Sequence, residues 1–259
     1  MSLQPTLSVI VPVYNEVDAV GPAVQAILGF LADHCSHYEI ILVESGSSDG
    51  SGAACDQLAA DNSAVRVIHE GARNGFGSAL RVGFAAAEMD AIVMITADLP
   101  FPFSAVAHAL SLLDEHGAVL SYRASDPRGL YRRVQSVIYN AIAKYALGLR
   151  VRHVNSALKI YRRGVYEQLQ LRECGWLFDA EAIYRLQERA VPCAEIPADL
   201  IDRETGTSSV GWRTPFRMLG DLRRLRVRLR ANPLPPLTTD ATATAPAATR
   251  ASMRPRELQ

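Results

Sequence analysis

The sequence predicts an α/β fold in which helices flank a mainly parallel sheet. Apolar runs rich in β-branched residues alternate with segments of helical periodicity, and a short polar cluster follows most of the apolar runs. Strands are expected at residues 7–13, 38–44, 65–69 and 91–96, with helices between them at 18–32, 50–60 and 77–89. This alternation indicates a doubly wound sheet with right-handed crossovers.

The regular alternation of strand and helix patterns changes after residue 120, where longer helical patterns begin. The expected elements are a helix at 130–147, a strand at 157–161, a helix at 178–189, a strand at 193–200 and a polar loop at 202–209. From residue 233 onward Thr, Ala and Pro dominate without a periodic apolar face. A segment with so little to bury is expected to be disordered, so the sequence predicts a folded domain over residues 1–232 and a tail over 233–259.

Composition limits the possible functions. With 259 residues and 49% hydrophobic content, the chain can bury one substantial core. Its formal net charge is zero, which gives no global attraction to nucleic acid. The N-terminus shows no leader pattern, and no apolar run approaches the roughly 20 residues that span a bilayer. A cytoplasmic protein, soluble or peripheral on the membrane, is therefore expected. The cysteines lack metal-site spacing and are predicted to be free thiols: Cys35, Cys55, Cys174 and Cys193.

The first predicted strand stops at Pro12 and is followed by Tyr14, Asn15 and Glu16. In an open α/β sheet, side chains that follow the carboxyl ends of the strands face a crevice and not the core. This turn is therefore predicted to bind a ligand.

Two Gly-containing turns follow the next strands. In the turn at 44–50, acidic side chains could bind a base or ribose, whereas Asp49 could equally cap the helix that follows. In the turn at 73–79, Gly75 and Gly77 permit a ligand to approach the backbone, although a Gly pair before a helix often marks only a turn.

Asp98 follows the fourth strand. A carboxylate at this place can hold Mg²⁺ or Mn²⁺ against the phosphates of a ligand, because such ions prefer oxygen ligands and need only one or two from the protein. A helix cap or an ordinary loop residue is the alternative.

These turns and three later motifs together resemble family 2 glycosyltransferases, in particular the dolichol/polyprenyl-phosphate sugar synthases. The resemblance covers roughly residues 7 to 210 and is carried by VPVYNE at 11–16, ESGSSD at 44–49, NGFG at 74–77, ADL at 97–99, Arg123, WLFDAE at 176–181 and DRETGTS at 202–208. It implies a GT-A fold, a nucleotide-diphosphate sugar donor and inversion at the anomeric carbon.

The resemblance also implies roles for individual residues. The donor would contact Pro12, Tyr14, Glu16, Glu44, Asp49, Asn74, Gly75, Gly77 and Ala97. Asp98 would hold the metal and the diphosphate, and Arg203 would meet the diphosphate from the far side. The acceptor phosphate would be met by Arg123, Arg132 and Ser136.

The chain departs from the family pattern at three places. Glu44 and Ser45 stand where the family has two aspartates, and Thr96 and Pro100 replace expected groups on either side of Asp98. The usual late lysine is Ser209. These departures leave Asp98 as the predicted ligand for Mg²⁺ or Mn²⁺.

Two basic segments suggest contacts with phosphate or membrane. Arg123, Arg128, Arg132 and Arg133 suit phosphate binding, with a solvated basic face as the alternative. The apolar stripe of the helix at 130–147 is expected to pack in the core unless it is exposed, and it comprises Leu130, Val134, Val137, Ile138, Ile142 and Tyr145. The segment at 213–230 is basic and amphipathic, so it could rest on an anionic membrane or pack on the domain.

Two functions of different classes are consistent with the sequence. The first is inverting sugar transfer to a polyprenyl phosphate; with a hydroxyl acceptor instead, Asp179 or Glu181 would serve as general base. The second is a non-catalytic GT-A domain that binds a nucleotide or a partner protein, as the replacements at Ser45 and Thr96 suggest. A dinucleotide-dependent oxidoreductase is disfavoured, because no Gly-rich phosphate turn follows the first strand.

Overall fold

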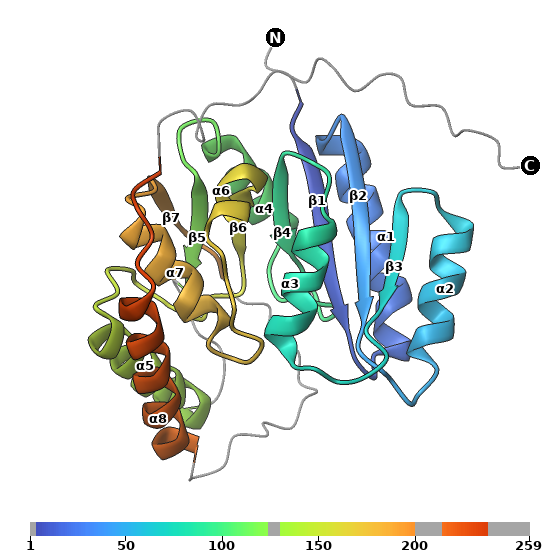
Figure 1. Ribbon diagram of the computed structural model, residues 1–259. Helices are drawn as coiled ribbons and strands as arrows, with labels where there is room; N and C mark the ends of the chain where they lie inside the picture. Colours follow the sequence, from blue (N-terminus) through green and yellow to red (C-terminus); the bar gives the residue numbers. More distant parts are fainter. Residues whose placement is uncertain (1–3, 124–129, 200–213, 238–259) are drawn as a thin grey trace, which may run out of the picture.

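A seven-stranded sheet with helices on both faces forms the centre of the molecule (Figure 1). The computed structural model describes residues 4–123, 130–199 and 214–237. The strands lie in the order β3-β2-β1-β4-β6-β5-β7. Their bounds are Thr6–Val13 (β1), His37–Glu44 (β2), Val65–His69 (β3), Ala91–Met94 (β4), Ala118–Tyr122 (β5), Lys159–Arg162 (β6) and Cys193–Pro197 (β7). Only β6 runs antiparallel to its neighbours among these strands, which confirms the predicted α/β fold with a mainly parallel sheet.

The helices cover the two faces of the sheet because side chains alternate along each strand. Val9 and Val11 of β1 face α1, α2 and α4, whereas Ile10 between them faces the side that carries α3, α6 and α7. The described helices are Val17–His34 (α1), Ser51–Asp61 (α2), Phe76–Ala86 (α3), Phe103–Leu112 (α4), Leu130–Leu147 (α5), Arg163–Gln168 (α6), Phe178–Glu188 (α7) and Thr214–Ala231 (α8).

Three elements were not predicted from the sequence, namely α4, β5 and α6. β5 is a run of only five residues that follows Gly117, and so short an apolar run has no periodicity by which a strand can be recognised. Two predicted strands are also shorter than expected, since β4 ends at Met94 and β7 ends at Pro197. The predicted tail lies outside the described residues from 238 onward.

α8 packs beside α5 at one end of the sheet (Figure 1). Its Leu222, Leu225 and Leu229 are buried in the same core cluster as Ala143 and Leu147 of α5. The basic segment therefore packs on the domain along one face, as one of the two predicted alternatives requires.

The apolar stripe expected to pack α5 into the core is largely exposed, so that expectation is wrong for four of its members. Val134, Val137, Ile138 and Tyr145 are 47%, 68%, 44% and 91% exposed. The helix instead buries the side that carries Asn140, Ala143 and Leu147, because that side faces α7 and α8. Ile142 is partly buried, and the side chain of Leu130 lies outside the description.

No helix in the described ranges is both long enough and apolar enough to cross a membrane.

Candidate functional site

The loops after β1 and β2 are hydrogen-bonded to each other at the carboxyl edge of the sheet. Asn15, whose φ is +54°, donates its backbone N–H to Ser47 Oγ at 3.1 Å and accepts the N–H of Ser48 at 2.9 Å. The N–H of Glu16 binds Ser51 Oγ at 2.8 Å. These bonds hold the exposed side chains of Tyr14 and Glu16 over the end of the sheet, beside the partly buried Pro12.

Asp49 serves as a cap for two helices. Its carboxylate accepts the N–H of Val17, at the start of α1, at 3.2 Å and the N–H of Ser51, at the start of α2, at 3.0 Å. The hydroxyl of Ser51 is the main reason that the pKa of Asp49 lies below its usual value. The capping alternative is therefore present in the structure, and the carboxylate remains exposed at the crevice.

Glu44 is buried and turned into its own loop. Its carboxylate accepts the N–H of Ser47 at 2.5 Å and lies 3.1 Å from Nδ1 of His69, on the neighbouring β3. Burial raises the pKa of Glu44, but the hydrogen bonds from Ser47 and His69 together bring it below the usual value. The carboxylate is therefore held ionised, and its hydrogen bonds shape the turn at 44–50.

Asp98 projects into solvent after β4, next to the buried Ala97. Thr96 Oγ1 donates to Asp98 Oδ1 at 2.5 Å, so the residue that replaces an expected carboxylate orients the one that remains. Burial is the main cause of the raised pKa of Glu16, and the negative charges of Asp98 and Asp49 add to it. The carboxylates of Glu16, Asp49 and Asp98 therefore lie near enough at this edge of the sheet for their charges to interact.

The exposed carboxylate of Asp98 fits a divalent ion that is held mainly through its ligand. Within the described ranges no cluster of three His, Cys, Asp or Glu side chains could enclose a metal. A single exposed carboxylate is nevertheless enough where the phosphates of the ligand and water supply the other oxygens, as is usual for Mg²⁺. A cavity of about 240 Å³ adjoins this point and is lined by Asp18, Ala19, Pro22, Ala23, Ala97 and Leu99.

Gly75 and Gly77 accommodate the protein's own backbone. A Cβ on Gly77 would lie 2.8 Å from the carbonyl carbon of Cys174, and one on Gly75 would lie 2.6 Å from the Cys174 oxygen. The N–H of Ser78 donates to this same oxygen at 3.0 Å. The close approach predicted for a ligand is thus made by the segment 173–175, while Asn74 stays exposed.

The exposed Arg73 stacks over the ring of Tyr14 at 4.3 Å and so links this turn to the first one.

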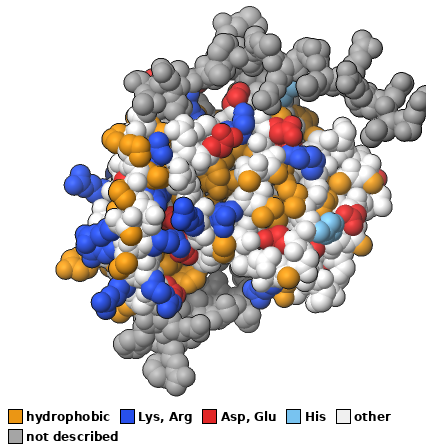
Figure 2. All heavy atoms as spheres, in the orientation of Figure 1, with side chains coloured by type: hydrophobic (Ala, Val, Ile, Leu, Met, Phe, Trp, Pro, Cys, Tyr) orange, Lys and Arg blue, Asp and Glu red, His pale blue; other side chains and the backbone are white. Residues whose placement is uncertain are grey.

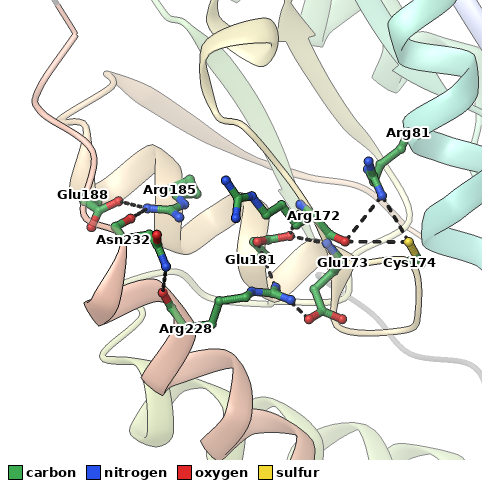
Figure 3. Close-up of polar contacts among 9 residues, drawn as sticks. All are labelled: Arg81, Arg172, Glu173, Cys174, Glu181, Arg185, Glu188, Arg228 and Asn232. Carbon is green, nitrogen blue, oxygen red and sulfur yellow. Dashed lines mark hydrogen bonds and ion pairs between the residues drawn. The ribbon is translucent and has the colours of Figure 1, made fainter.

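Glu181 lies at the centre of a polar network between α7, the segment 172–174 and α8 (Figure 3). One carboxylate oxygen accepts the N–H groups of Arg172 at 2.8 Å and Glu173 at 2.7 Å, and the other accepts Arg228 Nη2 at 3.0 Å. The side chain of Glu181 is 0% exposed. A general base must reach the proton of a substrate, so a buried carboxylate with both oxygens bound is poorly placed for that role.

Arg228 also donates to Glu173 at 2.7 Å, so this arginine of the basic segment packs on the domain. Arg223, Arg224, Arg226 and Arg230 are exposed, whereas Arg228 points into the domain. The sequence gives no signal that Arg228 differs from the other arginines of α8. Which arginine turns inward depends on which side of the helix packs on the domain, and only the structure shows that side.

We expect Arg228→Ala to lower the free energy of unfolding by about 3 kcal/mol, because it leaves the buried charge of Glu181 without its cation. The matched control Arg226→Ala removes an exposed arginine from the same helix and should change stability by no more than about 0.5 kcal/mol. Urea unfolding followed by circular dichroism measures both. Equal small effects would show that Arg228 does not hold α8 to the domain.

Asp179 forms a buried ion pair that the sequence analysis missed. Lys159 Nζ lies 3.1 Å from Asp179 Oδ2 and donates to the carbonyl oxygen of Ser156 at 2.5 Å. The two side chains are 6% and 18% exposed. A lysine in the middle of the apolar strand pattern at 157–161 was the available signal, since lysine is almost never buried without a partner.

Arg123 and Ser136, to which the resemblance gives a role in acceptor binding, are in direct contact. Arg123 Nη1 donates to Ser136 Oγ at 2.7 Å, and Nη2 donates to the carbonyl oxygen of Asn155 at 3.1 Å. Arg123 follows β5, whose carboxyl end lies at the same edge of the sheet as that of β4. The side chains of Arg128, Arg132 and Arg203 lie outside the described residues, as does Ser209.

Known proteins resemble this chain over most of its length. It is 27% identical over 215 residues to a polyprenol monophosphomannose synthase of Mycolicibacterium smegmatis, a match covering 78% of this chain and 80% of that one. It is 26% identical to a dodecaprenyl-phosphate galacturonate synthase of Rhizobium johnstonii, covering 83% of this chain and 65% of that one. This chain thus spans less than two thirds of the second relative.

Solved structures share the fold. Glucosyl-3-phosphoglycerate synthase from Mycobacterium tuberculosis, in complex with UDP, superposes with a TM-score of 0.64 at 20% identity, covering 86% of this chain and 80% of that one. A second structure of that enzyme contains Mn²⁺ with UDP. Mannosyl-3-phosphoglycerate synthase from Rubrobacter xylanophilus gives a TM-score of 0.63 at 17% identity, covering 88% and 75%.

These likenesses confirm the GT-A fold. The family described as "Glycosyl transferase family 2" matches residues 8–170, which contain the hydrogen-bonded loops after β1 and β2, Asp98, Arg123 and Ser136. The chain therefore belongs to glycosyl transferase family 2.

Proposed function

We propose that this protein transfers a sugar from a nucleotide-diphosphate sugar to a polyprenyl phosphate, with inversion at the anomeric carbon. The observation that carries the proposal is the Arg123–Ser136 contact at the carboxyl edge of the sheet, because a guanidinium beside a hydroxyl suits a phosphate. The relatives named for polyprenyl-linked sugar transfer support the choice of acceptor.

The positions of the two candidate bases favour a phosphate acceptor over a hydroxyl. Asp179 is paired with Lys159, and Glu181 is buried with both oxygens bound. A phosphate oxygen is already a nucleophile near neutral pH and needs no base. It would attack the anomeric carbon as the bond to the diphosphate oxygen breaks, and the nucleoside diphosphate would leave with the bonding electron pair.

On the donor side, the turns around Tyr14, Glu16 and Asp49 would hold the nucleotide. Asp98 would hold Mg²⁺ or Mn²⁺, which when bound offsets charge on the departing diphosphate. Thr96 would orient the Asp98 carboxylate, and Arg203 would face the diphosphate from the opposite side. Most of the rate enhancement would come from positioning the two phosphate-bearing substrates.

A polyprenyl phosphate resides in a membrane, so the protein would work at a membrane surface, on the cytoplasmic face. The exposed arginines of α8 would then meet anionic lipid.

The test separates acceptor binding from donor binding. We expect Arg123→Ala to lower kcat/KM for a short-chain polyprenyl phosphate in detergent by about 100-fold, since a charge-assisted contact to the acceptor phosphate would be lost. Donor affinity measured by calorimetry should stay within about twofold.

The matched control Arg150→Ala removes an exposed arginine and should leave both values unchanged. Product formed only with water-soluble hydroxyl acceptors would overturn the lipid assignment. Donor binding without transfer to either class of acceptor would indicate a non-catalytic domain.

A further inference from the structure

We propose that α5 and α8 together form a docking face for an anionic lipid bilayer, with α5 supplying the apolar part and α8 the charge. The α5–α8 face comprises Val134, Val137, Ile138 and Tyr145 of α5 with Leu219, Arg223, Arg226, Val227 and Arg230 of α8. The inference rests on the proposed function, because a membrane-resident acceptor requires a surface that meets lipid.

The distribution of exposed apolar side chains is the first argument. Of the ten large hydrophobic residues that are exposed in the described parts of the chain, six belong to these two helices. The other four are Tyr14, Val17, Phe76 and Trp176, which lie in or beside the turns around the candidate site. Such gathering distinguishes an interaction surface from scattered exposed residues.

The spacing on α5 gives the second argument. Val134, Ile138 and Tyr145 recur at intervals of four and seven residues, so they lie along one side of the helix. Asn140, Ala143 and Leu147 lie along the buried side. A helix with one apolar stripe in the core and another in solvent has an unpartnered face.

Charge identifies the occupant of this face. Together α5 and α8 contain nine Lys and Arg and a single acid, Asp221, whereas the rest of the chain holds 18 Lys and Arg against 26 Asp and Glu. Asp221 is itself paired with Arg224. These two helices are thus net positive, with Arg228 turned inward, while the rest of the chain is net negative. Figure 2 shows blue side chains interleaved with orange over these helices.

This combination fits an anionic bilayer better than another copy of the chain. Apolar side chains can enter the boundary between headgroups and acyl chains while arginines meet the phosphates beside them. A second copy would bring the same positive charges against these, which is unfavourable.

The experiment is flotation of the full chain with vesicles of phosphatidylglycerol and phosphatidylcholine, and with vesicles of phosphatidylcholine alone. The parent should bind the first kind and not the second. The triple variant Val137→Ser, Ile138→Ser and Tyr145→Ser should weaken binding by about tenfold or more, since its insertion area is lost. Arg223→Gln and Arg226→Gln together should weaken it by about 25-fold at low salt, with a smaller difference as salt is raised.

Val17→Ser is the matched control, because Val17 is also exposed but lies at the start of α1. It should float like the parent. Turnover on the short-chain acceptor in detergent should survive in the α5 and α8 variants, so failure of the docking face is distinguishable from failure of the proposed reaction. Binding that is equal on both kinds of vesicle, or equal losses in the triple variant and in Val17→Ser, would overturn the proposal. So would a lipid-free dimer, measured by sedimentation, that the triple variant dissociates.

Discussion

Asp98→Asn should lower the affinity for a nucleotide-diphosphate sugar in Mn²⁺ by at least about 10- to 100-fold while leaving the fold intact. Loss of a group that merely supports a metal ligand already has an effect of this size, and Asp98 is proposed as the ligand itself. The side chain is exposed, so its replacement disturbs no packing. Calorimetric titration with and without Mn²⁺ measures the loss, which should vanish when the metal is omitted.

A metal-free measurement checks the same carboxylate independently. The charge of Asp98 contributes to the raised pKa of Glu16, so the variant should show a lower Glu16 pKa in an NMR titration. Asp33→Asn, at an exposed position on α1, should change neither donor affinity nor this pKa. If Asp98→Asn lowered the Glu16 pKa yet kept full Mn²⁺-dependent affinity, the metal would be held elsewhere.

Asp179→Asn should lower the free energy of unfolding by about 3–5 kcal/mol at pH 7, because it leaves Lys159 buried without its counter-ion. Burial already lowers the pKa of Lys159 below its ordinary value of 10.5, against the opposing attraction of Asp179. Without Asp179 the folded-state pKa falls further, while the unfolded-state pKa is unchanged.

The sign of the pH dependence follows from this difference. Between the folded and unfolded pKa values the unfolded chain binds more protons, so stability rises with pH in that window. The deficit of Asp179→Asn should therefore shrink as pH increases toward 10.5. Denaturant titrations at several pH values would measure it.

The double variant Lys159→Met and Asp179→Leu is the control, since it removes both charges and should recover most of the stability without this pH dependence. A deficit of Asp179→Asn that is the same at every pH would show that Lys159 is not a buried cation.

The parts of the candidate site that are continuous in the chain were predictable from the sequence. A buried run that ends in Tyr14, Asn15 and Glu16 must present them at the carboxyl edge of a parallel sheet, and Asp98 follows by the same rule. The resemblance added Arg123 and Ser136, which the structure brings within hydrogen-bonding distance. These statements depend only on local order and on the direction of the strands.

The contacts between distant segments were not predictable. Arg228 and Glu181 are 47 residues apart, and nothing in either segment specifies the other. The same holds for Lys159 with Asp179, and for Gly77 with Cys174. In each case a local pattern suggested a ligand or a base, and the packing of another segment supplied the partner.

The sequence by itself determined the α/β class, the polar edge of the sheet and the family, because alternation and the motifs are properties of the chain order. Only the tertiary structure decided which side of α5 is buried and which arginine of α8 turns inward. The apolar stripe of α5 and the arginines of α8 show helical periodicity, which defines the sides of a helix but not the side on which its neighbours pack. That choice depends on the combined shapes of α5, α7, α8 and the sheet, which assemble only when the whole chain has folded.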